Sequence, residues 1–109
     1  MRVTAVGIAW FRPEDYETLL AMFADRDDVP DTYEDWIQKA ERFTNQLKRN
    51  GQAYQKVIID PKTFPAWCAA RGFRIDGKAR TQFAGEVVSR EVSDEQYQVV
   101  ILNERTDDN

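Results

Sequence analysis

The chain has 109 residues, of which 42% are hydrophobic and 31% are charged, and its net charge is −4. This length supports one hydrophobic core and excludes a multidomain enzyme. Three Trp, four Tyr and six Phe residues are too many for a disordered chain. We therefore predict one globular α/β domain over residues 1–103, followed by a disordered polar tail over 104–109.

The sequence contains no histidine and a single cysteine, Cys68. The lack of imidazole removes histidine-based acid–base catalysis, the usual nucleophile pairs and the commonest zinc ligand. Cys68 follows Trp67 in an apolar stretch, which favours a packed, unreactive thiol. We therefore expect a non-enzymatic protein without cofactor or metal, and a reducing, cytoplasmic location. The apolar run over 3–11 is too short for a signal peptide or a membrane span, so we expect no membrane association.

The first half of the chain predicts a strand and two helices. Small and β-branched apolar residues over 3–11 predict a strand that is buried on both faces. Pro13 suits the first turn of a helix, and apolar residues at helical spacing continue this helix to about residue 24. Thr32, with Asp35 three residues later, predicts the start of a second helix over 32–49. Asn50 and Gly51 follow as a left-handed stop.

A second strand and a short helix follow. The segment 53–60 alternates and then becomes continuously apolar, which predicts a strand. Either Asp60 or Thr63 can cap the next helix, and Gly72 is suited to end it.

The last third predicts a longer helix and a final strand. Asp76 caps the helix, which continues to about residue 91. Gly85 lies inside it and costs roughly 1 kcal/mol relative to alanine unless a neighbouring element packs closely there. The segment 96–103 (QYQVVILN) predicts the third strand.

The resulting order is β-α-α-β-α-α-β. Each connection between strands exceeds thirty residues and contains helices, which is typical of right-handed crossovers between parallel strands. We therefore predict a three-stranded, mainly parallel sheet covered by four helices. In the alternative, the last strand pairs antiparallel at an edge or with another copy of the protein, which would give a homodimer.

Charge is segregated along the sequence. Residues 14–35 carry nine acids and one base, whereas residues 39–90 carry eleven bases and four acids. Helix starts prefer acidic residues, and this preference alone is one explanation. The other is that the acidic region meets a basic surface of a partner protein, as in a small adaptor or inhibitor of bacterial or phage type. The residues that would bind this partner are Glu14, Asp15, Glu17, Asp25, Asp27, Asp28 and Asp31.

Two other functions remain open. Basic residues interleaved with aromatic ones favour an accessory protein that binds nucleic acid through Lys62, Arg71, Arg74, Lys78 and Arg80. Against this hypothesis, the pI is about 4.8, and Trp67 and Phe73 are expected in the core. The third hypothesis is a small-ligand crevice at the carboxyl edge of the sheet, formed by Trp10, Phe11, Arg12, Asp60 and Lys62.

Overall fold

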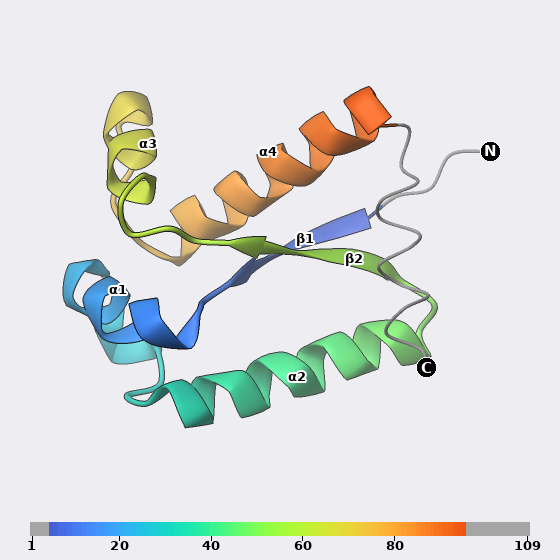
Figure 1. The fold of residues 1–109 in the computed structure, drawn as a ribbon, viewed down its shortest axis with the longest axis horizontal. Helices are drawn as coiled ribbons and strands as arrows, with labels where there is room; N and C mark the ends of the chain where they lie inside the picture. Colours follow the sequence, from blue (N-terminus) through green and yellow to red (C-terminus); the bar gives the residue numbers. More distant parts are fainter. Residues whose placement is uncertain (1–4, 96–109) are drawn as a thin grey trace.

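The computed structural model describes residues 5–95, and it describes side chains over 5–90. It is a small α/β domain in which α4 and α2 cover opposite faces of a parallel sheet, while α1 and α3 lie at the carboxyl end of the strands (Figure 1). In chain order the elements are β1 (Ala5–Trp10), the 3-10 turn η1 (Pro13–Asp15), α1 (Tyr16–Met22), the 3-10 turn η2 (Arg26–Asp28), α2 (Tyr33–Arg49), β2 (Ala53–Ile58), α3 (Phe64–Arg71) and α4 (Gly77–Glu95).

The structure confirms the predicted parallel pairing of the first two strands and the four predicted helices. β1 and β2 run parallel, with Ala5 opposite Ala53 and Trp10 opposite Ile58. Within residues 5–95 the sheet has two strands and not three. The predicted third strand over 96–103 and the predicted tail over 104–109 lie outside the described residues.

Most local signals at helix ends act as the sequence predicts, but the predicted cap of α3 is wrong, because Thr63 at its start forms no side-chain cap hydrogen bond and the Asp60 carboxylate accepts from the Lys62 N–H instead. The Oγ1 of Thr32 accepts a hydrogen bond from the Asp35 backbone N–H at 3.1 Å. A carboxylate oxygen of Asp76 accepts one from the Ala79 N–H at 3.0 Å. Gly51 and Gly72 both adopt positive φ, at 72° and 70°, which a residue without a side chain tolerates best.

The predicted helix over 13–24 is instead a 3-10 turn followed by the shorter α1, which ends at Met22. Phe23 turns to an extended conformation (φ −74°, ψ 125°) and is buried. The next residue donates its backbone N–H to the Ile75 carbonyl at 2.7 Å. A contact with a segment about fifty residues away in the chain therefore ends this helix, and local sequence does not carry that signal.

The main core lies where the carboxyl ends of the strands meet α1 and α3. Its largest fully buried side chains include Leu19, Ile59 and Phe64. The sheet itself is less buried than predicted, because Val6 of β1 is 38% exposed. The prediction of a first strand buried on both faces is therefore wrong for the described residues.

The close approach between elements occurs at Gly7 and not at Gly85. A Cβ atom on Gly7 would lie 2.7 Å from the carbonyl carbon of Ala84 and 2.9 Å from a methyl group of Val88. A Cβ on Gly85 would meet no atom within 4 Å. The missing side chain of Gly7 thus lets α4 pack directly on β1, whereas Gly85 only weakens its helix.

Candidate functional site

The acidic residues predicted to bind a partner come from η1, α1, η2 and the adjoining loops, at one end of the molecule (Figure 1). Five of the seven are exposed, and none of these five forms an ion pair with another described residue. We call these five residues the acidic surface: Glu14, Glu17, Asp27, Asp28 and Asp31.

Asp25 and Arg80 are placed differently from the prediction, because they bind each other. The two guanidinium nitrogens of Arg80 donate to the two carboxylate oxygens of Asp25 at 3.0 and 2.7 Å. The side chains are only 22% and 11% exposed, and the Arg80 guanidinium lies 4.2 Å from the Phe23 ring centroid. This hydrogen bonding to Arg80 holds the pKa of Asp25 below its ordinary value. The pair removes Asp25 from the acidic surface and Arg80 from the predicted basic one.

Two contacts fix the loop that carries Asp27, Asp28 and Asp31. The Asp25–Arg80 ion pair holds its beginning. At its other end the Tyr16 hydroxyl donates to the Pro30 carbonyl at 2.6 Å, and burial is the main cause that raises the pKa of Tyr16 to about 12. The three carboxylates are therefore carried on a segment that is tied to the core on both sides.

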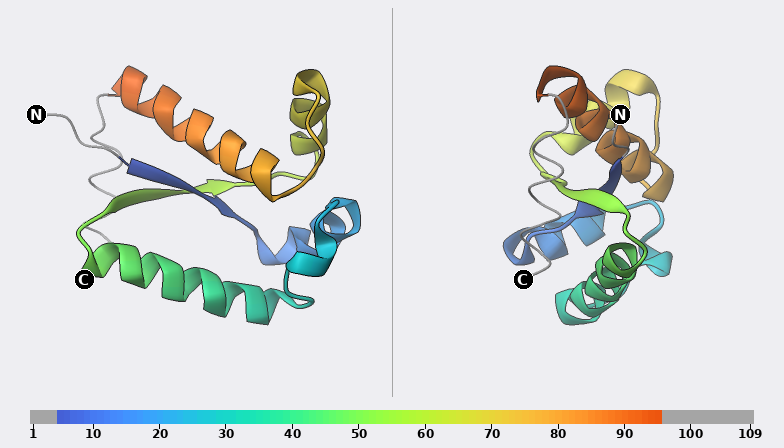
Figure 2. Two further views of the ribbon diagram at one scale, coloured as in Figure 1. Left: turned by 180° about the vertical axis from the view of Figure 1, so that it is seen from behind. Right: turned by 90° about the vertical axis from the view of Figure 1, so that its right-hand side faces the viewer.

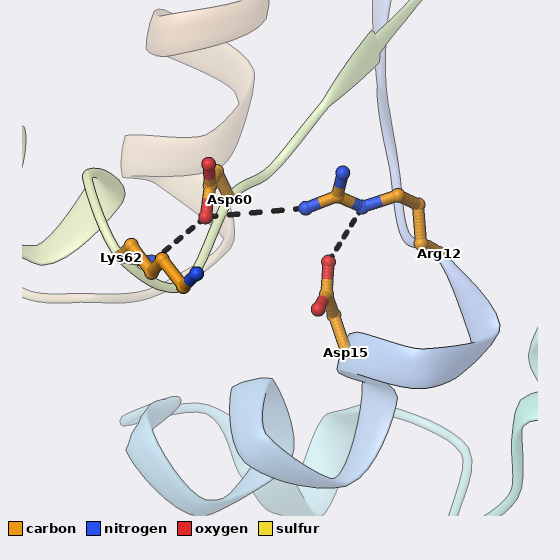
Figure 3. A network of polar contacts seen from close by, with 4 residues as sticks. All are labelled: Arg12, Asp15, Asp60 and Lys62. Carbon is orange, nitrogen blue, oxygen red and sulfur yellow. Dashed lines mark hydrogen bonds and ion pairs between the residues drawn. The ribbon is translucent and has the colours of Figure 1, made fainter.

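At the carboxyl end of the strands, the polar groups proposed to line a ligand crevice bind one another (Figure 3). Arg12 donates from Nε to Asp15 at 2.7 Å, and its Nη2 lies 3.9 Å from Asp60. Asp60 also accepts the Lys62 backbone N–H at 2.9 Å. The hydrogen bond to Asp15 is the main cause that raises the pKa of Arg12. The network joins the segment after β1 to the loop after β2, and it takes Asp15 out of the acidic surface.

Four of the five residues predicted to bind nucleic acid are exposed on α3, α4 and the loops beside them. We call them the basic surface: Lys62, Arg71, Arg74 and Lys78. Arg71 lies 4.3 Å from the Trp67 ring centroid and 3.4 Å from Glu86. Phe73, expected in the core, is 38% exposed. Together with Arg74 and Lys78 it lines a hollow of about 260 Å³.

A second hollow was not predicted from the sequence. It has a volume of about 310 Å³ and lies along β1, beside the loop before α2 and beside α2 itself. We call it the β1 groove; its apolar lining includes Ile8, Ala9, Val29, Pro30, Trp36 and Phe43. Phe43 of α2 is a large apolar residue, yet it is 48% exposed. Long-range packing, and not the residue type alone, decides how much of its side chain is covered.

The described side chains offer neither a reactive thiol nor a metal site. Cys68 is buried, and this burial raises the pKa of its thiol. Over residues 5–90, whose side chains the structure describes, no group of three or more Cys, Asp or Glu side chains is arranged to hold a metal ion. The helices within residues 5–95 are all too short or too polar to cross a membrane.

No protein-family model, curated protein or solved structure matches this chain. Function must therefore be inferred from the surfaces themselves.

Proposed function

We propose that the protein is a non-enzymatic adaptor or inhibitor whose acidic surface binds a basic surface of another protein. One observation carries this proposal. After Asp15 and Asp25 are taken up by internal ion pairs, five carboxylates remain exposed and unpaired among the described residues at the same end of the molecule. A cluster of like charges steers an oppositely charged partner and penalises partners of the same charge.

The way in which the loop that carries Asp27, Asp28 and Asp31 is held supports the same proposal. Tyr16 and Arg80 anchor the loop to the core through Pro30 and Asp25. A charged segment that is already ordered loses less conformational entropy on binding than a free one. Asp27, Asp28 and Asp31 are therefore preorganised for a partner with complementary charge.

Affinity capture followed by mass spectrometry tests this function. The baits are the wild-type chain, the triple variant Asp27→Asn, Asp28→Asn, Asp31→Asn, and a control variant. The control, Glu104→Gln, Asp107→Asn, Asp108→Asn, removes the same number of negative charges from the predicted tail. It separates the effect of net charge from the effect of the acidic surface.

We expect the wild type and the control to recover the same proteins with basic surfaces, and the triple variant to lose them. Recovery of identical proteins by all three baits contradicts the proposal. So does a wild-type bait that recovers no specific partner.

Binding of nucleic acid is the alternative, and the hollow beside Phe73 favours it. An exposed aromatic ring flanked by Arg74 and Lys78 can stack on a base while the cations contact phosphate. The alternative predicts that binding to single-stranded DNA or RNA weakens steeply as the salt concentration rises. It also predicts that this binding is lost in the double variant Arg74→Ala, Lys78→Ala. Binding that does not depend on salt eliminates it.

Two finer predictions belong to this proposal, the cytoplasmic location and the third strand over 96–103. Their support is the sequence: a single cysteine for the first, and the apolar run of the last segment for the second. Self-association through that strand is the alternative to its pairing within one molecule.

A further inference from the structure

β1 has an edge with no described strand beside it. On its other side, Trp10 accepts a hydrogen bond from the Ile59 N–H of the segment after β2 at 3.0 Å. Because the backbone groups of successive residues in a strand alternate in direction, Ile8 faces β2 in the same way as Trp10. The N–H and C=O groups of Gly7 and Ala9 therefore point to the opposite edge, where the described sheet ends.

The compositions of the two strands differ in the way expected for a central strand and an edge strand. β1 (AVGIAW) is entirely apolar, whereas β2 (AYQKVI) includes Gln55 and the exposed Lys56. Parallel strands whose two faces are covered are typically continuous apolar runs, and charged side chains, lysine above all, are common on edge strands. This pattern indicates that β2 is a true edge and that β1 is central.

The two layers of helices give the direction in which the chain continues. α2 connects β1 to β2 on one face of the sheet, and α4 follows β2 on the opposite face (Figure 2). Crossovers between parallel strands are right-handed in nearly all proteins. Two crossovers of the same hand with helices on opposite faces must run in opposite directions across the sheet. A parallel strand that follows α4 therefore lies beyond β1.

The position of α4 agrees with this direction. It packs on β1 at Gly7, through Ala84 and Val88, as a helix does when it crosses over a central strand. Its last turn lies near the amino end of β1 (Figure 1). A segment that leaves α4 there runs alongside β1 in the parallel sense.

We propose that residues 96–103 occupy the free edge of β1 as a third, parallel strand of the same molecule and fill the β1 groove. The segment contains four consecutive apolar residues, 99–102, and its eight residues span about 26 Å when extended. Its side chains would cover apolar groups left partly exposed beside that edge, including Val6 at 38% and Phe43 at 48%. The expected strand order is β2, β1, then 96–103.

Amide hydrogen exchange measured by NMR on the unmodified full-length chain tests this proposal. The Ile8 amide is an internal control, because it faces β2. We expect the Gly7 and Ala9 amides to exchange at least about a hundredfold more slowly than in an unfolded peptide, together with alternate amides of 96–103. A protected Ile8 with freely exchanging Gly7 and Ala9 overturns the proposal.

A spin label distinguishes the two edges of the sheet and the two sources of the strand. We would attach a nitroxide at Gln98→Cys in a Cys68→Ala background, with Thr106→Cys as the control site. The label at 98 should broaden Gly7 and Ala9 more strongly than the amides of β2. Stronger broadening of β2 overturns the proposal. In a second sample, an isotope-labelled chain without nitroxide is mixed with a chain that carries the nitroxide at residue 98. Broadening of the isotope-labelled chain also overturns the proposal, because the strand would then come from a second molecule.

Discussion

Replacing Asp25 by asparagine should destabilise the protein because it leaves the Arg80 guanidinium without its charged partner. Removing one member of a buried ion pair costs about 3–5 kcal/mol, whereas an exposed pair contributes about 0–1 kcal/mol. The side chains of Asp25 and Arg80 are 22% and 11% exposed, so the pair lies between these limits but closer to the buried one. We expect a loss of about 2–3 kcal/mol in the free energy of unfolding.

Guanidinium chloride unfolding at neutral pH measures this loss. Asp28→Asn is a matched control, because Asp28 is exposed and unpaired among the described residues, and it should change stability by less than about 0.5 kcal/mol. The double variant Asp25→Asn, Arg80→Gln should recover part of the loss, because no buried charge is then left alone.

The effect of Asp25 should also depend on pH. The pKa of its carboxyl is lowered from 3.8 in the folded protein, so the ion pair contributes its full stability only above that ordinary value. As the pH falls through the lower folded pKa, the contribution is lost and the wild type approaches Asp25→Asn. If Asp25→Asn and Asp28→Asn lose equal stability at neutral pH, the ion pair does not hold the loop and the reasoning is refuted.

Three further predictions concern helix packing, a core hydrogen bond and the buried thiol. Gly7→Ala should destabilise by more than about 2 kcal/mol because α4 must move, while Gly85→Ala should stabilise by roughly 1 kcal/mol; a thermal melt that ranks them the other way contradicts the packing of α4 on β1. Tyr16→Phe should cost about 1 kcal/mol by losing the bond to Pro30. In the wild type this contribution should be present below pH 10 and lost as the pH rises towards about 12; an alkaline titration that is equal in both proteins argues against it. Cys68 should react with a thiol reagent only at the rate of unfolding, and fast native labelling would contradict its burial.

Much of the fold could be predicted because its signals are local. Thr32 with Asp35 marks the start of α2, and Gly51 and Gly72 mark left-handed stops, since each depends on a few neighbouring atoms. The end of α1 at Met22 could not be predicted, because it depends on a backbone hydrogen bond from residue 24 to Ile75.

The candidate site was harder to predict than the fold for the same reason. Charge counts indicated an acidic and a basic region, but they could not show that Asp25 and Arg80, 55 residues apart, bind each other. Gly7 and Gly85 are both glycines in regular elements, and only the approach of α4 distinguishes them. Pairing and close packing between distant segments are set by the tertiary fold and leave no local pattern.

The dependence of association rate on ionic strength tests most directly whether the acidic surface recognises a partner. For a protein recovered by the wild-type bait, the rate constant should fall at least about tenfold between 0.05 and 0.5 M salt. For the triple variant Asp27→Asn, Asp28→Asn, Asp31→Asn, the association rate constant should be lower at low salt and almost independent of salt. Equal rates and equal salt dependence in both proteins would contradict recognition through these carboxylates.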